Sequence, residues 1–136
     1  MSEARVPGTL RVHAVADATP ALAELAFLLG KDERIGEVRT CSTATAALLA
    51  LQSETFDVVL LDVAMPGLTG LELASVLRQF RHPPAVVFVT AHQHHAVEAF
   101  DLNAVDYLLK PVHESRMREA IRRVVEGGGA HPDEDD

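Results

Sequence analysis

Two short runs in the middle of the chain, FDVVLL at residues 56–61 and AVVFV at residues 85–89, constrain the fold more than any other feature. A strand with one face in water alternates apolar and polar residues, whereas these runs are apolar at nearly every position. Such runs indicate central strands of a parallel sheet that is covered on both faces. The chain must therefore supply helices between its strands to cover that sheet.

Strand and helix patterns alternate five times along the chain. The expected strands are residues 10–16, 37–41, 56–61, 85–89 and 105–109, and the expected helices are residues 20–29, 43–52, 70–80, 93–100 and 114–126. Thr19 is placed to cap the first helix, with Pro20 at its first position, and Thr69 and Glu72 have capping-box spacing. The alternation predicts an α/β fold, a doubly wound five-stranded parallel sheet flanked by five helices.

The length of 136 residues predicts one domain. We expect a folded domain over residues 10–126, preceded by an N-terminal extension over residues 1–9. Residues 127–136 are rich in glycine and acidic residues and are expected to form a flexible tail or linker. The sequence leaves both alternatives open, a natural terminus or a linker to a further domain, and favours the linker.

Charge and composition argue against several kinds of binding partner and cellular location. The chain has 20 acidic and 12 basic residues, and this net charge of -8 argues against direct binding of nucleic acid. Cys41 is the single cysteine, so an intrachain disulfide cannot form. No apolar run approaches the roughly 20 residues of a membrane span. We therefore expect a cytoplasmic chain that does not contact the membrane.

Polar side chains follow four of the expected strands at the point where each strand ends. They are Asp17, Asp62, Thr90 and Lys110. An open α/β sheet binds its ligand outside the carboxyl ends of its strands, so these side chains should converge. Carboxylates suit Mg²⁺, and an ammonium with a hydroxyl suits the charge of a transferred phosphoryl group. Any one of these residues alone would more simply be a helix cap or a solvated side chain, but together they indicate phosphoryl transfer to a carboxylate.

Three motifs carry a resemblance to a known family. Residues 61–67, LDVAMPG, together with Gly70, resemble the phosphorylation loop of response-regulator receiver domains. Residues 89–91, VTA, resemble the end of the strand that carries their threonine, and residues 106–111, DYLLKP, resemble their last strand and lysine. The resemblance implies a flavodoxin-like receiver topology with strand order 2-1-3-4-5. The stretch from Ala99 to Pro111 further resembles receivers of the LytTR class, whose output domain binds DNA.

The resemblance also implies a role for each residue at the strand ends. Asp62 would accept a phosphoryl group from a sensor histidine kinase, as a phosphoacceptor rather than as a turnover enzyme. Asp17, Asp62 and the backbone carbonyl of Ala64 would hold Mg²⁺. Lys110 would pair with the phosphoryl group, and Thr90 would move to form a hydrogen bond with it.

The output is expected to be a change of surface. Tyr107 would swing inward as Thr90 moves, and the surface of the fourth helix, fifth strand and fifth helix would change. Receivers often form homodimers through this surface, and DNA would be reached only through an attached output domain. Ala64 and His92 occupy positions where receivers tune the hydrolysis of the phosphoaspartate. The bond between Lys110 and Pro111 resembles one that is cis in the family.

Two positions depart from the family pattern. Receivers usually carry two adjacent acidic residues after the first strand, and here the pair reads Ala16-Asp17; an acidic residue often follows, and here it is Ala18. Fewer carboxylates attract Mg²⁺ less strongly, which predicts weaker metal binding than in a receiver with both acids. The departure keeps open an alternative, a pseudo-receiver that binds partners without being phosphorylated.

Other function classes lack their defining residues. A haloacid-dehalogenase-type phosphatase would need a second acid where Ala64 stands. A nucleotide-binding protein or a flavodoxin would need a phosphate-cradling loop at residues 16–20, which contain no glycine. Histidines at positions 92, 94 and 95 could place two imidazoles on a metal ion, but no nearby carboxylate or cysteine completes such a site. The arginines of the last helix are expected to form a solvated face paired with acidic residues: Arg116, Arg118, Arg122 and Arg123.

Overall fold

The five expected strands form one parallel sheet in the computed structural model, which describes residues 9–65, 67–91 and 96–127. The sheet has the order β2-β1-β3-β4-β5, as the family resemblance implied. The strands are β1 (Leu10–Val15), β2 (Ile35–Cys41), β3 (Val58–Asp62), β4 (Ala85–Thr90) and β5 (Asp106–Leu109). Because β2 and β5 end the order, they are the two edges of the sheet.

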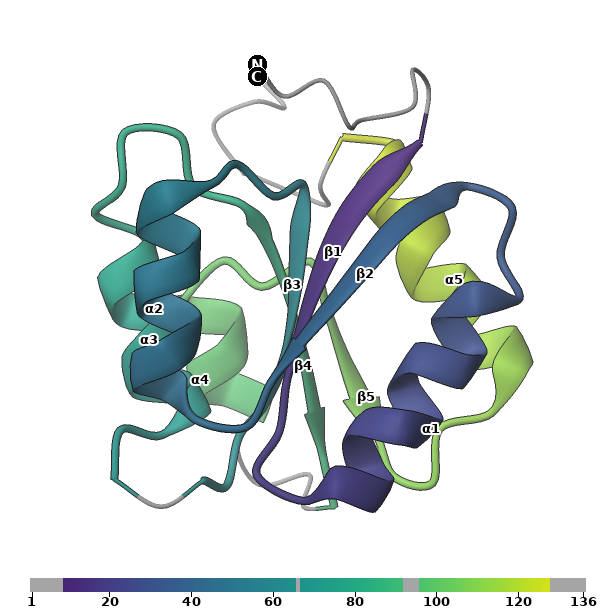
Figure 1. Cartoon of the computed structure of the whole chain (residues 1–136), viewed down its shortest axis with the longest axis horizontal. Coiled ribbons are helices and arrows are strands. Elements are labelled where there is room, and N and C mark those ends of the chain that lie inside the picture. The colour runs from purple at the N-terminus through teal and green to yellow at the C-terminus, as the bar shows by residue number, and fades with distance from the viewer. Residues whose placement is uncertain (1–8, 66, 92–95, 128–136) are drawn as a thin grey trace.

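Helices cover both faces of the sheet. They are α1 (Thr19–Gly30), α2 (Ala44–Ser53), α3 (Gly70–Leu77), α4 (Ala96–Asp101) and α5 (Glu114–Val125). Figure 1 shows α1 and α5 on one face and α2, α3 and α4 on the other. The start of the expected helix at residues 93–100 lies outside the described residues. Within the described part of the chain, no helix is long and apolar enough to cross a membrane.

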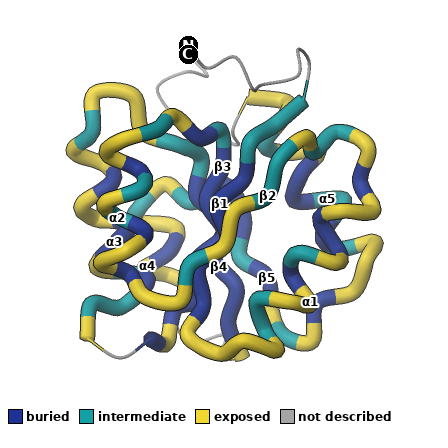
Figure 2. The backbone as a smooth tube through the Cα atoms, viewed as in Figure 1, coloured by how far each residue is buried: buried dark blue, intermediate teal, exposed yellow. Residues whose placement is uncertain are grey.

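The central strands are buried as their sequences predict. Every residue of β3 is buried, and so is every residue of β4 after Ala85 (Figure 2). Edge strand β2, by contrast, has no fully buried residue. Alternate strand residues enter two aliphatic cores, one beneath α1 and α5 and one beneath α2, α3 and α4. The site therefore rests on a rigid centre, because tightly packed cores resist displacement.

The helix ends confirm one capping prediction and correct another. Thr69 and Glu72 form the expected capping box at the start of α3. The expected cap at Thr19 is wrong, because α1 begins at Thr19 itself and its N-cap position is Ala18. Ala18 has an extended backbone, and its carbonyl accepts the first helical hydrogen bond, from the amide of Leu22 at 3.1 Å. An alanine cannot supply a side-chain cap, so α1 begins without one.

Candidate functional site

The carboxylate of Asp62 is the centre of the site. Asp62 is the last residue of β3, and 5% of it is exposed. Lys110, which follows β5, places its Nζ 2.9 Å from Asp62 Oδ2. The amide of Ala64 donates to Asp62 Oδ1 at 3.1 Å. A buried carboxylate is tolerated only with such partners. Asp62 and Lys110, 48 positions apart in the sequence, are therefore held together by an ion pair as well as by the order of their strands.

The register of the central strands places Thr90 and Lys110 beside Asp62. Asp62 pairs with Val89 across β3 and β4, and Thr90 pairs with Leu109 across β4 and β5. The amide of Lys110 donates to the carbonyl oxygen of Thr90 at 2.8 Å. Thr90 is 1% exposed, so its side chain is buried at the end of the sheet where the strands have their carboxyl ends and where Asp62 ends β3. Three of the expected site residues therefore end neighbouring strands.

The loop after β3 depends on two glycines. A Cβ atom on Gly70 would overlap the carbonyl oxygen of Asp62, so only glycine lets α3 begin this close to the acid. The amide of Gly70 donates to the carbonyl of Val63 at 3.1 Å, which closes the loop onto β3. Gly67 has a φ of 77°, a left-handed conformation that favours glycine. The loop holds Ala64 exposed beside the Asp62 carboxylate.

Few oxygen donors follow β1 and β3 to serve a magnesium ion. Asp17, two residues after β1, is exposed, whereas its neighbour Ala16 is fully buried and donates its amide to the carbonyl of Cys41 at 3.2 Å. Among the described residues, no group of three or more His, Cys, Asp or Glu is placed to hold a metal. Mg²⁺ is commonly held by one or two carboxylates and completes its shell with water and phosphate. Asp17, Asp62 and the Ala64 carbonyl are a donor set of that kind.

Tyr107, the expected switch residue, lies on edge strand β5 opposite Phe88. It is half-buried and packs against the core beneath α2, α3 and α4. The peptide bond between Lys110 and Pro111 is cis, as the resemblance implied. His92, His94 and His95 lie outside the described residues, so the hydrolysis-tuning and metal predictions for them have no structural counterpart.

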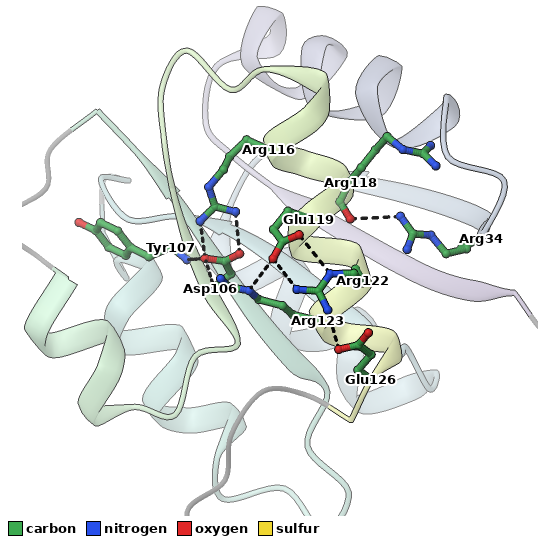
Figure 3. Close-up of polar contacts among 9 residues, drawn as sticks. All are labelled: Arg34, Asp106, Tyr107, Arg116, Arg118, Glu119, Arg122, Arg123 and Glu126. Carbon is green, nitrogen blue, oxygen red and sulfur yellow. Dashed lines mark hydrogen bonds and ion pairs between the residues drawn. The ribbon is translucent and has the colours of Figure 1, made fainter.

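The arginines of α5 have acidic partners, as expected. Arg122 lies 2.6 Å from Glu119 and 2.7 Å from Glu126, and the hydrogen bond from Arg122 lowers the pKa of Glu119 to about 2. Arg116 differs from this surface pattern, because its partner is the buried carboxylate of Asp106 (Figure 3). Its hydrogen bonds to Asp106 raise the pKa of Arg116.

Sequence reasoning missed three buried polar groups, of which Asp32, 2% exposed, is paired with Arg34 at 2.6 Å. Asp106 is 8% exposed and His13 is 1% exposed. A signal for Asp106 was available, since an acid followed by Tyr107 in an apolar strand needs a basic partner, and Arg116 lies ten residues on. His13 stands in the run LRVHAV, where its position in β1 marked it as a core residue.

Three relatives are informative. The chain is 43% identical over 115 residues to an uncharacterized response regulatory protein of Yersinia pestis, which covers 85% of this chain and 48% of the relative. It is 37% identical over 101 residues to the transcriptional regulatory protein LytR of Staphylococcus aureus, with coverage of 74% and 41%. The solved response regulatory domain of mrkE from Klebsiella pneumoniae superposes with a TM-score of 0.80 at 37% identity, covering 86% of this chain and 96% of that one.

The chain spans less than half the length of these two sequence relatives, whereas it covers nearly all of the solved mrkE domain. The match to the family described as the response regulator receiver domain extends over residues 12–122. That span contains all five strands except the first residues of β1, and it contains the whole of the site around Asp62. The chain belongs to the response regulator receiver domain family of two-component systems.

Proposed function

We propose that this receiver accepts a phosphoryl group on Asp62 from a sensor histidine kinase, in a reaction that depends on Mg²⁺. The observation that carries the proposal is the buried Asp62 carboxylate, whose oxygens are held by the Lys110 ammonium at 2.9 Å and by the Ala64 amide at 3.1 Å. An ionised carboxylate held in place is a nucleophile, and a cation beside it can stabilise the charge that a phosphoryl group brings.

The transfer is a single displacement at phosphorus. An Asp62 oxygen forms a bond to phosphorus while the bond from phosphorus to the histidine nitrogen breaks, and the electron pair of that bond stays on the imidazole. Lys110 Nζ then pairs with the oxygens of the new phosphoryl group, and the buried Thr90 lies at the next strand end to bind them. Bound Mg²⁺ would be held by Asp17, Asp62 and the Ala64 carbonyl and would neutralise phosphoryl charge.

A groove beside Lys110 fits the approach of the phosphodonor. Its volume is about 310 Å³, and α1 contributes Ala21, Glu24 and Leu25 to its lining while Lys110 and Pro111 form the other side. A partner that docks there lies next to the ammonium that contacts Asp62. The kinase is therefore proposed to bind across the start of α1 and the segment after β5.

The phosphorylated state is proposed to change the surface of α4, β5 and α5. The elements of this surface carry exposed apolar side chains: on α4, Val97 is 72% and Phe100 79% exposed, and on β5, Leu109 is 43% exposed. Covering apolar side chains of this size is favourable. A second copy of the domain is the proposed occupant, and the reaction ends with hydrolysis of the phosphoaspartate at a rate tuned by Ala64 and His92.

Control of transcription is the proposed output. LytR of Staphylococcus aureus is named as a transcriptional regulatory protein, and this chain covers 41% of its length. DNA binding would belong to an attached domain, because the receiver chain carries a net charge of -8. The second candidate, a pseudo-receiver, is favoured by one observation: Ala16, fully buried, stands where receivers carry an acid.

The test is the intact mass of the protein after incubation with Mg²⁺ and acetyl phosphate. We expect a gain of one phosphoryl mass that is labile to base and absent in Asp62→Asn. Asp57→Asn is the matched control, because Asp57 lies just before the opposite end of β3, where its carboxylate accepts from the Arg11 amide at 2.8 Å. No gain at any Mg²⁺ or donor concentration would overturn phosphorylation and favour the pseudo-receiver.

The substitution Ala16→Asp should tighten Mg²⁺ binding, because it restores a carboxylate beside Asp17 and adds Coulombic attraction for the ion. We expect about a tenfold lower dissociation constant, equivalent to about 1.4 kcal/mol, measured by calorimetric titration. Gln79→Glu, which adds the same charge at an exposed position past the end of α3 that lies away from Asp62, is the control for a general charge effect. An unchanged constant in Ala16→Asp would contradict the argument that Ala16 weakens the site.

A further inference from the structure

A carboxylate at the start of β5 binds the strand and a helix at the same time. The amide of Tyr107 donates to Asp106 Oδ1 at 2.8 Å, so the side chain of Asp106 satisfies a backbone group of the edge strand. The guanidinium of Arg116, on α5, donates to the same carboxylate through Nη1 to Oδ2 at 2.8 Å and through Nη2 to Oδ1 at 2.7 Å. Figure 3 shows these contacts together, with the Tyr107 ring directed away from them.

The geometry of this contact is directional. Two parallel hydrogen bonds between a guanidinium and a carboxylate fix both distance and orientation, unlike a single ammonium contact. Asp106 is 8% exposed, so water competes weakly for its oxygens. Arg123, also on α5, adds a longer contact of 3.4 Å to Oδ1. A shift of β5 therefore has to be followed by α5 or has to break these bonds.

The other end of the same strand leads to the phosphorylation site. β5 is only four residues long, from Asp106 to Leu109, and Lys110 follows directly. Lys110 Nζ contacts Asp62 Oδ2 at 2.9 Å. β5 is an edge strand and pairs only with β4. On its other side, side-chain contacts rather than a neighbouring strand hold it in position. A change of partner at Lys110 acts on one end of a short strand whose other end is bound to α5.

We propose that Asp106 and Arg116 form a positioning pair that couples the state of the Asp62–Lys110 ion pair to α5. When Lys110 exchanges the Asp62 carboxylate for a phosphoryl oxygen, the strain on β5 passes through the Asp106 carboxylate to Arg116 and moves the α5 surface. Neither residue touches the reacting atoms, so both act through Tyr107 and Lys110. This inference rests on the proposed function for its physiological trigger, but the coupling itself exists in the unphosphorylated protein.

The coupling can be measured without phosphorylation. Asp62→Asn removes the charged partner of Lys110, and NMR would report the response in the backbone amides of α5 and in the Nε signals of Arg116 and Arg123. We expect these signals to shift in Asp62→Asn relative to the wild type. The same substitution is then made in Asp106→Asn, which keeps a hydrogen-bond acceptor for the Tyr107 amide. There, the change that Asp62→Asn causes in the α5 signals should be smaller by about threefold or more, because residues that act as a unit are not additive. Signals of Thr90 should still respond.

Matched variants separate coupling from a merely structural role. Glu126→Gln removes the charge of a partner of Arg122 just past the end of α5 and should leave the α5 response intact. Arg116→Lys keeps the charge but loses the two-bond geometry, so it should weaken the response as Asp106→Asn does, and it serves as the second variant if Asp106→Asn does not fold. An α5 response that persists in a folded Asp106→Asn or Arg116→Lys protein, or its absence in Asp62→Asn alone, would overturn the proposal.

Phosphorylation and coupling fail independently. If the wild type gains no phosphoryl mass while the α5 response still depends on Asp106, the proposed function is wrong and the coupling stands. If Asp62 is phosphorylated while α5 responds equally in wild type and Asp106→Asn, the coupling is wrong and the function stands.

Discussion

The two edges of the sheet are each held by arginines and carboxylates, but the clusters connect different things. At the β2 edge, Arg11 and Arg39 share the carboxylates of Glu37 and Glu54, with distances from 2.7 to 2.9 Å. This cluster ties β1 and β2 to the residue that follows α2. At the β5 edge, the cluster around Asp106 ties a strand to α5, and the same strand leads to Lys110.

The β2 cluster is closed on itself. Each arginine donates to both glutamates, and these hydrogen bonds raise the pKa of Arg11 and lower the pKa of Glu37. Arg11 also lies over the ring of Phe56, with its Cζ 4.5 Å from the ring centroid. None of these residues contacts Asp62 or Lys110 in the described part of the chain. Similar ion-pair chemistry therefore stabilises both edges, but only the β5 cluster lies on a strand that leads to Lys110, and the proposed transmission of a change along that strand is tested by the following substitutions.

Lys110→Ala should have the largest effect, because it removes the cation beside Asp62. We expect the rate of phosphorylation by acetyl phosphate to fall on the order of 100-fold, as for loss of a preorganised charge-stabilising group. The rate is read from intact mass against time. Lys31→Ala is the control, since Lys31 is the other lysine of the chain and lies 3.7 Å from Glu114, away from the site. Similar rates for Lys110→Ala and the wild type would mean that Lys110, which follows β5, does not contribute to phosphorylation.

Arg11→Met should change stability without changing phosphorylation. The Arg11 side chain is 12% exposed, and its loss leaves Glu37 and Glu54 without one of their two cations. We expect the free energy of unfolding to fall by about 1.5–3 kcal/mol, the range for hydrogen bonds to charged groups, measured by urea unfolding. Arg81→Met, at an exposed position after α3, should have no comparable effect. A slowed phosphorylation in Arg11→Met would mean that the β2 edge also reaches the site.

His13→Leu should alter how stability depends on pH. His13 is 1% exposed, and neither ring nitrogen has a hydrogen-bond partner among the described residues. Burial, and then the charge of Arg39, lower the pKa of His13, so the unfolded chain takes up a proton at a higher pH than the folded one. The free energy of unfolding should therefore fall as pH drops below about 6.5, because the unfolded state binds the extra proton.

In His13→Leu this part of the pH dependence should disappear. Between about pH 7.5 and about pH 5.5 the wild type should lose on the order of 1 kcal/mol more than the variant, since one unit of pKa difference corresponds to about 1.4 kcal/mol. Urea unfolding at several pH values measures both proteins. His82→Leu, at an exposed position, should keep the wild-type dependence. Parallel curves for wild type and His13→Leu would show that protonation of His13 does not contribute.

The centre of the molecule could be predicted from the sequence because it depends on patterns within one segment. The apolar runs of β3 and β4 identify strands buried on both faces, and Asp62 and Thr90 follow from where those runs end. The convergence of Lys110 with Asp62 also follows, since the carboxyl ends of parallel strands all lie at the same end of the sheet. These inferences need no knowledge of side-chain contacts.

The edges could not be predicted in the same way, because their contacts depend on register and helix packing. Arg11 meets Glu37 only because these residues pair across β1 and β2, and a single sequence does not give that register. The α5 arginines were expected to be uniformly solvated, yet Arg116 bonds a buried acid while Arg122 lies on the surface. The sequence shows which charges exist and leaves open which of them lie inside.

Glu119→Gln should have the smallest effect on stability. It also tests whether the cluster around Asp106 extends to the exposed side of α5. Glu119 contacts Arg122 at 2.6 Å and Arg123 at 3.3 Å on the exposed side of α5, where salt screens such pairs. Its pKa is lowered to about 2, so any stability it contributes is present above the unfolded value of 4.5 and is lost as pH falls towards about 2. Urea unfolding should barely separate variant and wild type at neutral pH, and added salt should remove the difference.

The α5 response to Asp62→Asn should survive in Glu119→Gln, because the bonds from Arg116 to Asp106 remain. Loss of that response would mean that the coupling runs along the exposed surface of α5 through Arg123, which contacts both Glu119 and Asp106. Survival would confine it to the buried carboxylate and its two-bond contact. The β5 edge would then differ from the β2 edge through one acid, Asp106, which binds Arg116 on α5 and begins the strand that leads to Lys110 beside Asp62.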